Sequence, residues 1–525
     1  MKYIPSFILP LIVVLNFGIS YSQNEKPIIA NLSFNNDLST KTITIFFDLL
    51  DQEDENIEIT FKASYDFGNK FLVNTSNATG DVGYPVNVGN QKSITWYYGD
   101  IWNNIEGKTL RVIADDLYEI DINELVAKVD SNRIKSMLNF ISKPRSFDYA
   151  PEHLLVVRDT LEALLTSYNY DVKKQKFDYE GNQATNIIGY KQGLKDERRT
   201  IVMDAHYDAY FNAVGADDNG SGVVGFMEAA RVLSEYNFDK SIEFIGFDQE
   251  ENYLLGSINY VFFGGIEPWK IIEGALNFEM IGYYSEEPYS QEFPEGFDLL
   301  FPEQQQQLIE DEFRGNFIFL AGNDASIHLV NAFHEAAENY VPELKVISGI
   351  VPLNGLIAPD LLRSDHAPFW FSGKPALMIT DGAEFRNYHY HTPNDVVANL
   401  DFNFLTNVTK ACMATMIEMA GINHATTKTF VVEDQIITSI NQNENCEVLL
   451  YPNPTVEKLN IQLTSCINSN HKIIAKIYDV SGHLVAQKQF SNSNAQISVV
   501  DFSCGTYLLE LNDGNTSFTY SFVVQ

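Results

Sequence analysis

One segment places a histidine and an aspartate where both could serve a metal ion. "TIVMDAHYDAY", residues 200–210, ends an apolar run with His206 and Asp208, two positions apart. Side chains at positions i and i+2 of a strand share a face, so both can point into one site. A metal-binding histidine usually donates its second ring N–H to an oriented acceptor. We therefore interpret His206 as a candidate ligand and Asp208 as its partner.

Carboxylates follow two further apolar runs. "IEFIGFDQEENYLLGS", residues 242–257, carries Glu250 and Glu251 side by side after its apolar part. Such a pair can divide the work, because one carboxylate can bind a metal while the other acts as general base toward an activated water. In "GALNFEMIGYY", residues 274–284, Glu279 lies among apolar neighbours. A buried carboxylate must be neutral, paired or metal-bound, so Glu279 is a third candidate.

Other acids and histidines occur in turn-like segments. "GADDNGSG", residues 215–222, sets Asp217 beside Asp218 before a predicted helix. A helix cap explains one acid there but not two. "LLRSDHAPFW" and "FRNYHYHTPNDV" add Asp365, His366, His389 and His391. Each segment alone also fits a solvated loop, but mixed histidine and carboxylate ligands suit zinc, and a carboxylate shared by two cations is typical of two-metal hydrolysis.

The segments that must position these residues alternate between helical and strand patterns. Helical apolar spacing occurs at 132–141, 152–168 and 222–236, and short apolar strands at 186–191, 200–206, 241–247, 274–282 and 374–380. The alternation predicts an α/β domain over residues 122–425, with a central mixed, mostly parallel sheet and helices on both faces. Ligands bind beyond the carboxyl ends of strands in such sheets, where most of the candidates lie.

All-β patterns flank this domain. Residues 25–118 alternate apolar and polar side chains between Asn, Gly and Asp turns, which predicts a β-sandwich. A polar linker is predicted at 426–445, and residues 446–525 again show short, evenly spaced strands typical of a small sandwich.

The composition bounds the compartment and the partners. The 525 residues carry a formal net charge of −35, which argues against nucleic-acid binding. Residues 1–22 combine a lysine, an apolar stretch and small residues, as a signal peptide does, and no later apolar run is long enough to span a bilayer. Three of the four cysteines cluster near the C-terminus, which permits one bridge there.

The motif set resembles family twenty-eight of the metallopeptidases, which holds secreted bacterial di-zinc aminopeptidases with glutaminyl cyclases as relatives. "HYD", "GADDNGSG", "EE" followed by "LLGS", "FEMIG", "SDHAPFW" and "YHTPNDV" occur in that family's order over roughly residues 122–425. The resemblance implies an exported zinc aminopeptidase that acts on peptide N-termini, with two Zn²⁺ per chain.

The resemblance also implies a role for each motif residue. Zinc ligands would be His206, Asp217 as the bridge, Glu251, Glu279 and His391. Glu250 would be the general base, Asp208 would orient His206, and Tyr390 would stabilise the oxyanion. Asp218 would follow a cis peptide and shape the turn without binding metal. Asp365 and His366 would line the pocket, and His389 is interpreted as exposed.

Two residues depart from the family pattern. Glu279 occupies a position that is more often Asp, and the longer side chain could shift one zinc. Tyr253 replaces a glycine two residues after the paired glutamates and could fill part of the substrate cleft. Neither change removes a ligand.

The C-terminal segment resembles the sorting domain of the type IX secretion system. "YPNP", "IYDVSGHLV" and "CGTYLLEL" carry this resemblance. It implies passage across an outer membrane by that secretion machinery, followed by release or attachment to the cell surface.

Three alternative functions remain open. A glutaminyl cyclase would keep one zinc and lack the paired aspartates. A dipeptidase or carboxypeptidase would need a basic pocket for a free carboxylate, for which Arg363 and Arg386 are the nearest candidates. A non-catalytic surface-binding protein would be expected to have lost a ligand or Glu250.

Overall fold

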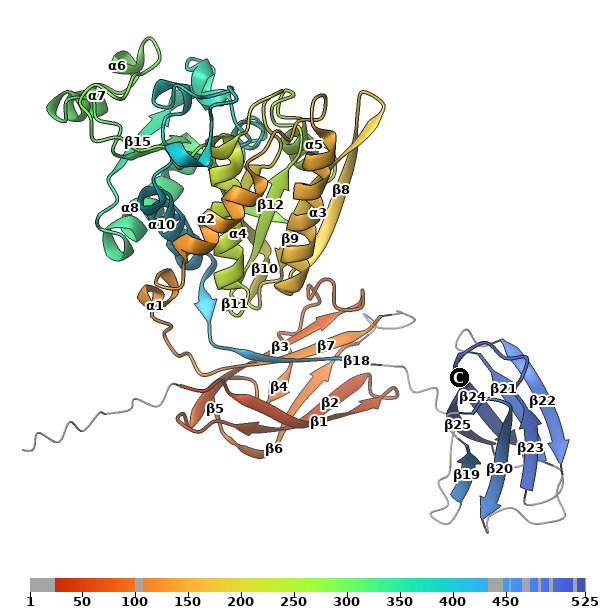
Figure 1. Cartoon of the computed structure of the whole chain (residues 1–525). Coiled ribbons are helices and arrows are strands. Elements are labelled where there is room, and N and C mark those ends of the chain that lie inside the picture. Colours follow the sequence, from red (N-terminus) through yellow and green to blue (C-terminus); the bar gives the residue numbers. More distant parts are fainter. Residues whose placement is uncertain are drawn as a thin grey trace, which may run out of the picture. The chain divides into compact units, whose positions relative to one another are not determined.

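The computed structural model describes residues 24–99, 107–432, 447–452, 455–464, 473–479, 483–490, 494–512 and 517–524 (Figure 1). The predicted signal peptide, residues 1–22, lies outside these ranges. The chain divides into two compact units, one up to Val431 and the other from Val432.

An eight-stranded mixed sheet forms the centre of the first unit, in the order β15-β14-β16-β13-β10-β12-β9-β8. Its strands are β8 (Asp171–Tyr179), β9 (Asn182–Lys191), β10 (Asp196–His206), β12 (Lys240–Phe247), β13 (Ile271–Phe278), β14 (Ile318–Asn323), β15 (Val346–Val351) and β16 (Ala376–Thr380). Four of the pairings are parallel: β10 with β12, β10 with β13, β13 with β16 and β14 with β15. The predicted mixed, mostly parallel sheet is confirmed.

Helices cover both faces of this sheet because its strands are apolar on both sides. Along β10, Met203 packs in one hydrophobic cluster and its neighbour Val202 in another, as strand alternation requires. The first cluster lies under α1 (Ile122–Val126), α2 (Ser131–Ile141), α3 (Pro151–Ser167), α4 (Gly222–Leu233), α8 (Ile327–Tyr340) and α10 (Phe402–Ala420). The second lies under α5 (Leu255–Phe262), α6 (Phe297–Leu300), α7 (Pro302–Glu310) and α9 (His366–Phe371).

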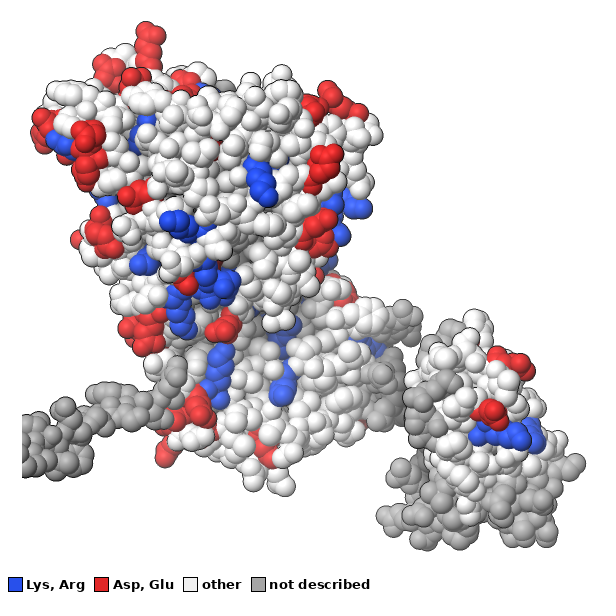
Figure 2. Space-filling view, in the orientation of Figure 1, with Lys and Arg blue, Asp and Glu red and all other residues white. Residues whose placement is uncertain are grey.

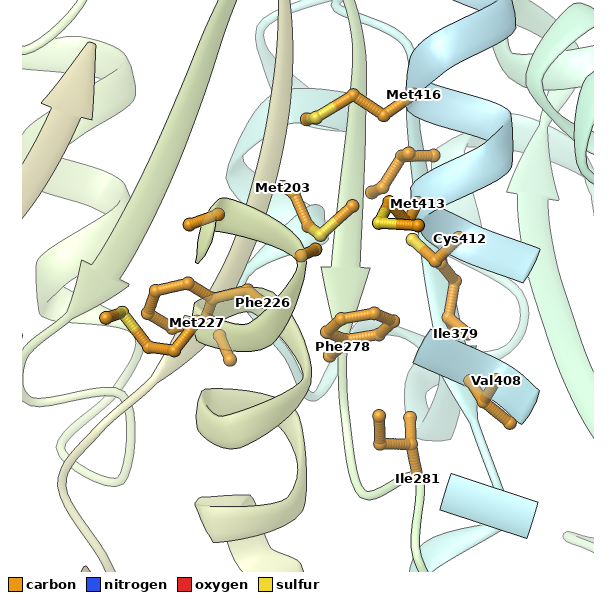
Figure 3. Packing of buried hydrophobic residues seen from close by; sticks show 14 of the residues in the cluster. Met203, Phe226, Met227, Phe278, Ile281, Ile379, Val408, Cys412, Met413 and Met416 are labelled. Carbon is orange, nitrogen blue, oxygen red and sulfur yellow. The ribbon is translucent and has the colours of Figure 1, made fainter. Parts of the chain in front are cut away.

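The helices α4 and α10 lie closest to the strands that carry the site. Figure 3 shows Phe226 and Met227 of α4 and Met413 of α10 packed around Met203 and Phe278. This densely packed apolar layer covers one face of β10 and β13 and holds these strands in place. The loops that follow their carboxyl ends therefore begin at fixed positions.

The N-terminal region of the first unit is a sandwich of two four-stranded sheets. One sheet has the order β1-β2-β6-β4, with β1 (Ile28–Asp37), β2 (Thr42–Leu50), β6 (Gly89–Tyr97) and β4 (Thr79–Gly80). The other has the order β18-β7-β3-β5, with β18 (Thr426–Val431), β7 (Thr109–Asp115), β3 (Asn56–Ser64) and β5 (Gly83–Asn87). The flanking β-sandwich is therefore present, with one strand from outside the predicted range.

That strand corrects the predicted linker at 426–445. Residues 426–431 form β18, which pairs antiparallel with β7, for example Thr426 with Ala114. The pairing satisfies backbone groups that a linker would leave to water. Its partner lies more than 300 residues earlier, too far for local sequence pattern to reveal. Residues 433–445 of the predicted linker lie outside the described residues.

The second unit consists of two small antiparallel sheets. One holds β19 (Glu447–Tyr451), β20 (Lys458–Thr464) and β23 (Asn494–Ser498), and the other β22 (Leu484–Phe490), β21 (Ile473–Tyr478), β24 (Gly505–Asn512) and β25 (Ser517–Val524). Leu459, Ile477 and Leu509 are buried between them. Cys412 and Cys504 are free thiols, and the other two cysteines lie outside the described residues.

Acidic side chains dominate the charge of the surface. Figure 2 shows Asp and Glu residues along the margins of the part of the first unit that holds the eight-stranded sheet, in keeping with the net charge of −35. Among the described residues, no helix combines the length and the apolar character needed to cross a bilayer.

Candidate metal centre

Three neighbouring parallel strands deliver most of the predicted ligands to one edge of the sheet. His206 is the last residue of β10, Glu250 and Glu251 follow β12, and Glu279 follows β13. The registers align these ends, since His206 pairs with Phe247 and Asp204 with Asn277. Parallel strands therefore explain why residues far apart in sequence meet here.

Two groups of ligand atoms lie side by side at this edge and share Asp218. In the first, His206 Nε2 lies 3.4 Å from Asp218 Oδ1 and 3.6 Å from Glu279 Oε2. In the second, His391 Nε2 lies 3.2 Å from Asp218 Oδ2 and 3.1 Å from Glu251 Oε2. Within each group the ligand atoms lie within 4.8 Å of one another. The two oxygens of Asp218 thus face two different histidines.

The structure reverses the positions that the sequence predicted for the two adjacent aspartates. Asp218, predicted only to shape the turn, lies between the two groups, whereas Asp217, predicted to bridge, points away. The Asp217 oxygens accept hydrogen bonds from the Gly282 N–H at 2.9 Å and from Asn387 Nδ2 at 2.9 Å. The non-proline cis peptide joins Asp218 to Asn219, one bond later than predicted. The carboxylate of Asp217 therefore stabilises the fold through hydrogen bonds, and the carboxylate of Asp218 is placed to bind metal ions.

A second aspartate holds this turn in place. Asp395, from the segment "YHTPNDV", accepts hydrogen bonds from the Asp217 N–H at 3.1 Å and the Asp218 N–H at 3.1 Å. Gly215 starts the turn with a φ of 62°, and a Cβ there would lie 2.5 Å from the Asp218 carbonyl oxygen. Asp395 belongs to a quoted motif, but sequence reasoning gave it no role.

A buried arginine fixes the same loop from behind. Arg145 donates to the carbonyls of Tyr207 at 2.9 Å, Val214 at 2.8 Å and Gly215 at 2.7 Å. It is fully buried, and burial lowers its pKa, although the carboxylates of the site oppose that shift. Nothing in "SKPRSFD" distinguishes Arg145 from a surface arginine, so sequence reasoning missed it.

Asp208 ties the paired glutamates to His206. Its Oδ1 accepts the Glu250 N–H at 3.1 Å and its Oδ2 the Glu251 N–H at 3.2 Å, while Oδ1 lies 3.4 Å from His206 Nδ1. Asp208 therefore lies beside Nδ1 of His206, whereas the other ligand atoms lie beside Nε2. This is the position of a partner that orients a metal-binding histidine.

Glu279 is oriented by a hydroxyl that sequence reasoning did not single out. Ser364 Oγ lies 2.6 Å from Glu279 Oε2 and donates to it. The longer side chain that replaces the family's usual aspartate still places a carboxylate oxygen within 3.6 Å of His206.

The electrostatics of the centre show an excess of buried negative charge. Burial raises the pKa of Glu251 to about 8, helped by Asp218, and raises the pKa of Glu250 well above its usual value. Burial lowers the pKa of His391, but Asp218 and Glu251 outweigh it and bring that pKa to about 10. Within residues 24–99 and 107–432, the ion pairs of these carboxylates are with histidines, not with Lys or Arg.

Several polar atoms at the centre are buried without a hydrogen-bond partner. They include both ring nitrogens of His206, Nε2 of His391, Oδ2 of Asp218 and Oε1 of Glu251. Buried polar groups in proteins are normally satisfied, so this concentration fits a place for cations. The donor set, two imidazoles with carboxylates, is the kind that zinc prefers.

An apolar pocket adjoins the centre and shares Glu279 and Tyr390 with it. Its wall contains Phe293, Phe297, Phe317, Phe319, Leu361 and Met378. Phe293, Phe297, Phe317 and Phe319 of this wall come from the segment between residues 283 and 360. Arg363 lies at the pocket but its guanidinium is paired with Glu384, and it donates to the Tyr390 hydroxyl at 3.0 Å.

Four predictions for the surroundings need correction. Asp365 and His366 do not line the pocket: both are fully buried, and His366 Nε2 contacts the Leu361 carbonyl at 2.9 Å. Tyr253 is 89% exposed and is not among the residues that line this pocket. His389 is half-buried rather than exposed and belongs to neither group of ligand atoms.

Comparisons with known proteins identify the catalytic region. Residues 186–416 match the model of peptidase family M28. The protein YfbL of Escherichia coli is 34% identical over 278 residues, which cover 50% of this chain and 80% of YfbL.

The chain belongs to peptidase family M28. Aminopeptidase YwaD of Bacillus subtilis is 39% identical to this M28 chain over 122 residues, 23% of the chain and 26% of YwaD. Leucine aminopeptidase 1 of Blastomyces gilchristii is 24% identical over 335 residues, 60% of the chain and 77% of that protein. The M28 chain is thus a hydrolase of the metallo-exopeptidase class, and the donor set of its metal centre is of the kind that zinc prefers.

Among solved structures, the LapA aminopeptidase of Legionella pneumophila aligns with 58% of the M28 chain and 75% of its own length, at 21% identity and a TM-score of 0.44. The C-terminal residues 449–525 match the model of a secretion system C-terminal sorting domain. The resemblance to the type IX sorting domain is confirmed, and it indicates export with secretion or cell-surface attachment.

Proposed function

We propose that this M28 chain is an exported two-zinc aminopeptidase that removes large apolar residues from peptide N-termini. The observation that carries the proposal is the position of Asp218, whose two carboxylate oxygens face His206 on one side and His391 on the other. A carboxylate shared in this way is the arrangement that two close cations require.

Each zinc would have its own set of residues. His206 and Glu279 would hold one ion, Glu251 and His391 the other, and Asp218 would bind both. The zinc ions, when bound, polarise the scissile carbonyl and lower the pKa of water. The proposal assigns no metal-binding role to Asp217.

Glu250 is suited to act as the general base. Its Oε2 lies 3.8 Å from His206 Nε2, and no hydrogen bond occupies its carboxylate among the described residues. Glu250 would accept a proton from the attacking water and transfer it to the nitrogen of the leaving amine. Asp208 would hold the Glu250 backbone in position through the 3.1 Å hydrogen bond.

Tyr390 would donate a hydrogen bond to the carbonyl oxygen as that oxygen gains charge. Its hydroxyl already accepts from Arg363 at 3.0 Å, which leaves the hydroxyl hydrogen free to point elsewhere. A preorganised donor of this kind stabilises an oxyanion.

The charges beside the pocket favour an amino terminus over a carboxyl terminus. Bound zinc would offset the carboxylates of the centre, so the choice between the two ends of a peptide depends on the cations beside the pocket. Arg363 is paired with Glu384 and lies 3.8 Å from Asp360, and the fully buried Arg386 donates to Gln291 at 2.6 Å. Arg363 is occupied by acids, and Arg386 is fully buried and does not line the pocket, which argues against a carboxypeptidase. The phenylalanine-lined pocket fits a large apolar side chain.

The test uses zinc-loaded protein and three matched peptides, Phe-Ala-Ala, its N-acetyl form and Ala-Ala-Phe. We expect release of Phe from the first, none from the second, and removal of Ala rather than Phe from the third. Metal analysis alongside should find about two zinc ions per chain, as two-metal hydrolysis requires.

Two results would overturn the proposal. Release of the C-terminal Phe from Ala-Ala-Phe would show a carboxypeptidase. One zinc per chain, together with cyclisation of an N-terminal glutamine and no hydrolysis, would show a glutaminyl cyclase.

A further inference from the structure

Exposed aromatic side chains gather on one side of the metal centre. Tyr149 is 55% exposed, Tyr210 42% and Phe211 52%. Phe147 and Tyr179 lie half-buried beside them. We call these five residues the aromatic rim. Single exposed rings are ordinary, but several exposed rings gathered near one site mark a candidate binding surface.

The rim begins at a metal-centre residue and lies opposite the pocket. The His391 ring stacks on Tyr390 with centroids 3.7 Å apart and on Tyr210 with centroids 3.9 Å apart. Two rings this close cannot share one face of an imidazole, so His391 lies between them. Tyr390 lines the apolar pocket, and Tyr210 therefore faces the other way.

Ring contacts extend the rim away from His391. Phe211 follows Tyr210 in the chain and packs against Tyr149 with centroids 5.1 Å apart. Phe147 packs against Tyr179 edge to face at 5.0 Å. Edge-to-face and tilted pairs at these distances are favourable aromatic contacts. Four of the five rings are thus held in aromatic pairs, and the fifth, Tyr210, is held against His391.

The backbone under the rim is held by buried groups. Arg145 binds the carbonyls of Tyr207 and Val214, the Ala209 N–H donates back to the Arg145 carbonyl at 3.2 Å, and Ser146 Oγ donates to the Phe211 carbonyl at 2.5 Å. The two loops that carry Tyr149, Tyr210 and Phe211 are therefore fixed before any partner arrives, which lowers the entropy cost of binding.

We propose that the aromatic rim binds the part of a peptide substrate on the carboxyl side of the scissile bond and selects apolar or aromatic residues there. This inference rests on the proposed aminopeptidase function. A peptide whose first side chain enters the pocket must leave across the opposite side of the centre, and an extended chain advances roughly 3.4 Å per residue. Two or three residues after the bond would then lie over the rim.

Charges beside the rim sharpen the expected selectivity. Asp148 and Glu180 are exposed near Tyr179, and partial burial raises the pKa of Tyr179, with Glu180 and Asp148 adding to that shift. Their carboxylates would repel acidic residues in the leaving segment. The substrate class is therefore an oligopeptide with an apolar, non-acidic sequence after the first residue.

The test compares two peptides that differ only after the scissile bond, Leu-Ala-Ala-Ala and Leu-Phe-Tyr-Ala. Initial cleavage of the first bond by the zinc-loaded full chain gives kcat and KM for each. We expect kcat/KM to favour the aromatic peptide by about tenfold, through KM, from two aromatic contacts. The double variant Tyr149→Ala, Phe211→Ala should reduce this ratio about fivefold.

Two comparison variants separate the loss of rings from general damage. Tyr149→Phe keeps the ring and should keep the ratio. Phe263→Ala removes a ring that is 70% exposed outside the rim, after α5, and should also keep it. Binding of the two uncleaved peptides to the Glu250→Gln chain, measured by calorimetry, should show the same preference without turnover.

Equal KM values for the two peptides in the unmodified chain, or an unchanged ratio in the double variant, would overturn the rim proposal. A double variant that alters only the mass measured by light scattering would also overturn it and would identify the rim as a contact between two copies. Failure of both peptides to be cleaved would refute the aminopeptidase itself, while binding to the Glu250→Gln chain would still report on the rim.

Discussion

Two buried glutamates, Glu243 within strand β12 and Glu250 shortly after it, have opposite surroundings. Glu243, within the strand, is 1% exposed and is bound by Lys270 and by the Tyr260 hydroxyl. Glu250, after the strand, is 8% exposed and has no Lys or Arg partner among the described residues. The strand therefore contains an acid that the protein neutralises itself, and the segment after it contains an acid that has no Lys or Arg partner among the described residues.

The contrast separates acids that support the fold from acids that support the reaction. Lys270 is 2% exposed and also lies 4.2 Å from the centre of the Tyr190 ring, so its charge is fully used inside the protein. The acids of the metal centre face histidines and unpartnered polar atoms instead. A buried acid without a protein cation is costly, and such acids collect where an external cation completes the structure.

The largest effect should come from Glu250→Gln. This change removes the general base and keeps the size of the side chain, so we expect kcat to fall about 10²- to 10⁴-fold. Zinc content, measured by mass spectrometry of the metal, should stay at the level of the unmodified chain. Unchanged turnover would show that Glu250 is not the general base. It would also contradict the distinction between Glu243 as a structural acid and Glu250 as a catalytic one.

Lys270→Met tests the other half of the contrast. It leaves the buried Glu243 carboxylate without its cation, which should cost about 3–5 kcal/mol of unfolding free energy. Urea unfolding followed by circular dichroism measures this loss. Lys240→Met is the matched control, because its pair with Glu273 is partly exposed and should contribute about 1 kcal/mol or less. Equal shifts for the two variants would contradict the comparison.

Asp218→Asn and Asp217→Asn distinguish two adjacent acids with different tasks. Loss of the shared carboxylate at 218 should weaken zinc binding by more than about 100-fold, beyond the cost of losing a residue that only orients a ligand. Asp217→Asn should keep zinc and lower stability, because it disturbs the hydrogen bonds to Gly282 and Asn387. Competition with a zinc chelator measures the first effect. Retention of zinc by the 218 variant would restore Asp217 as the bridge.

A smaller effect is expected from Asp208→Asn. Asp208 now accepts hydrogen bonds from the backbone N–H groups of Glu250 and Glu251. The asparagine side chain has only one acceptor oxygen, so its NH₂ group would face one of these N–H donors and that hydrogen bond would be lost. Zinc affinity or kcat should fall about 10- to 100-fold. Asp159→Asn, on the exposed surface of α3, should change neither quantity. A loss of stability alone would make Asp208 part of the supporting structure.

Much of the fold and the gathering of the site follow from local sequence pattern. Apolar runs that end in His206, Glu250 or Glu279 predict parallel strands whose carboxyl ends meet, and the structure confirms that these side chains lie together. The pattern cannot decide between Asp217 and Asp218, because both occupy one turn and the choice depends on Gly282 and Asn387, which lie in distant segments. Arg145 and Asp395 were missed for a similar reason, since their contacts are with backbone groups far along the chain.

The strand β18 completes the N-terminal sandwich only after the whole eight-stranded sheet has been synthesised. Its partner β7 precedes the whole catalytic region, so the sheet of the N-terminal sandwich stays one strand short until residue 431 has been made. Closing a loop of this length is slow, and the waiting edge of β7 can pair with other chains in the meantime. A truncated chain that stops at residue 425 would keep every candidate metal ligand and still expose that edge. The shortest self-sufficient enzyme should therefore extend through β18.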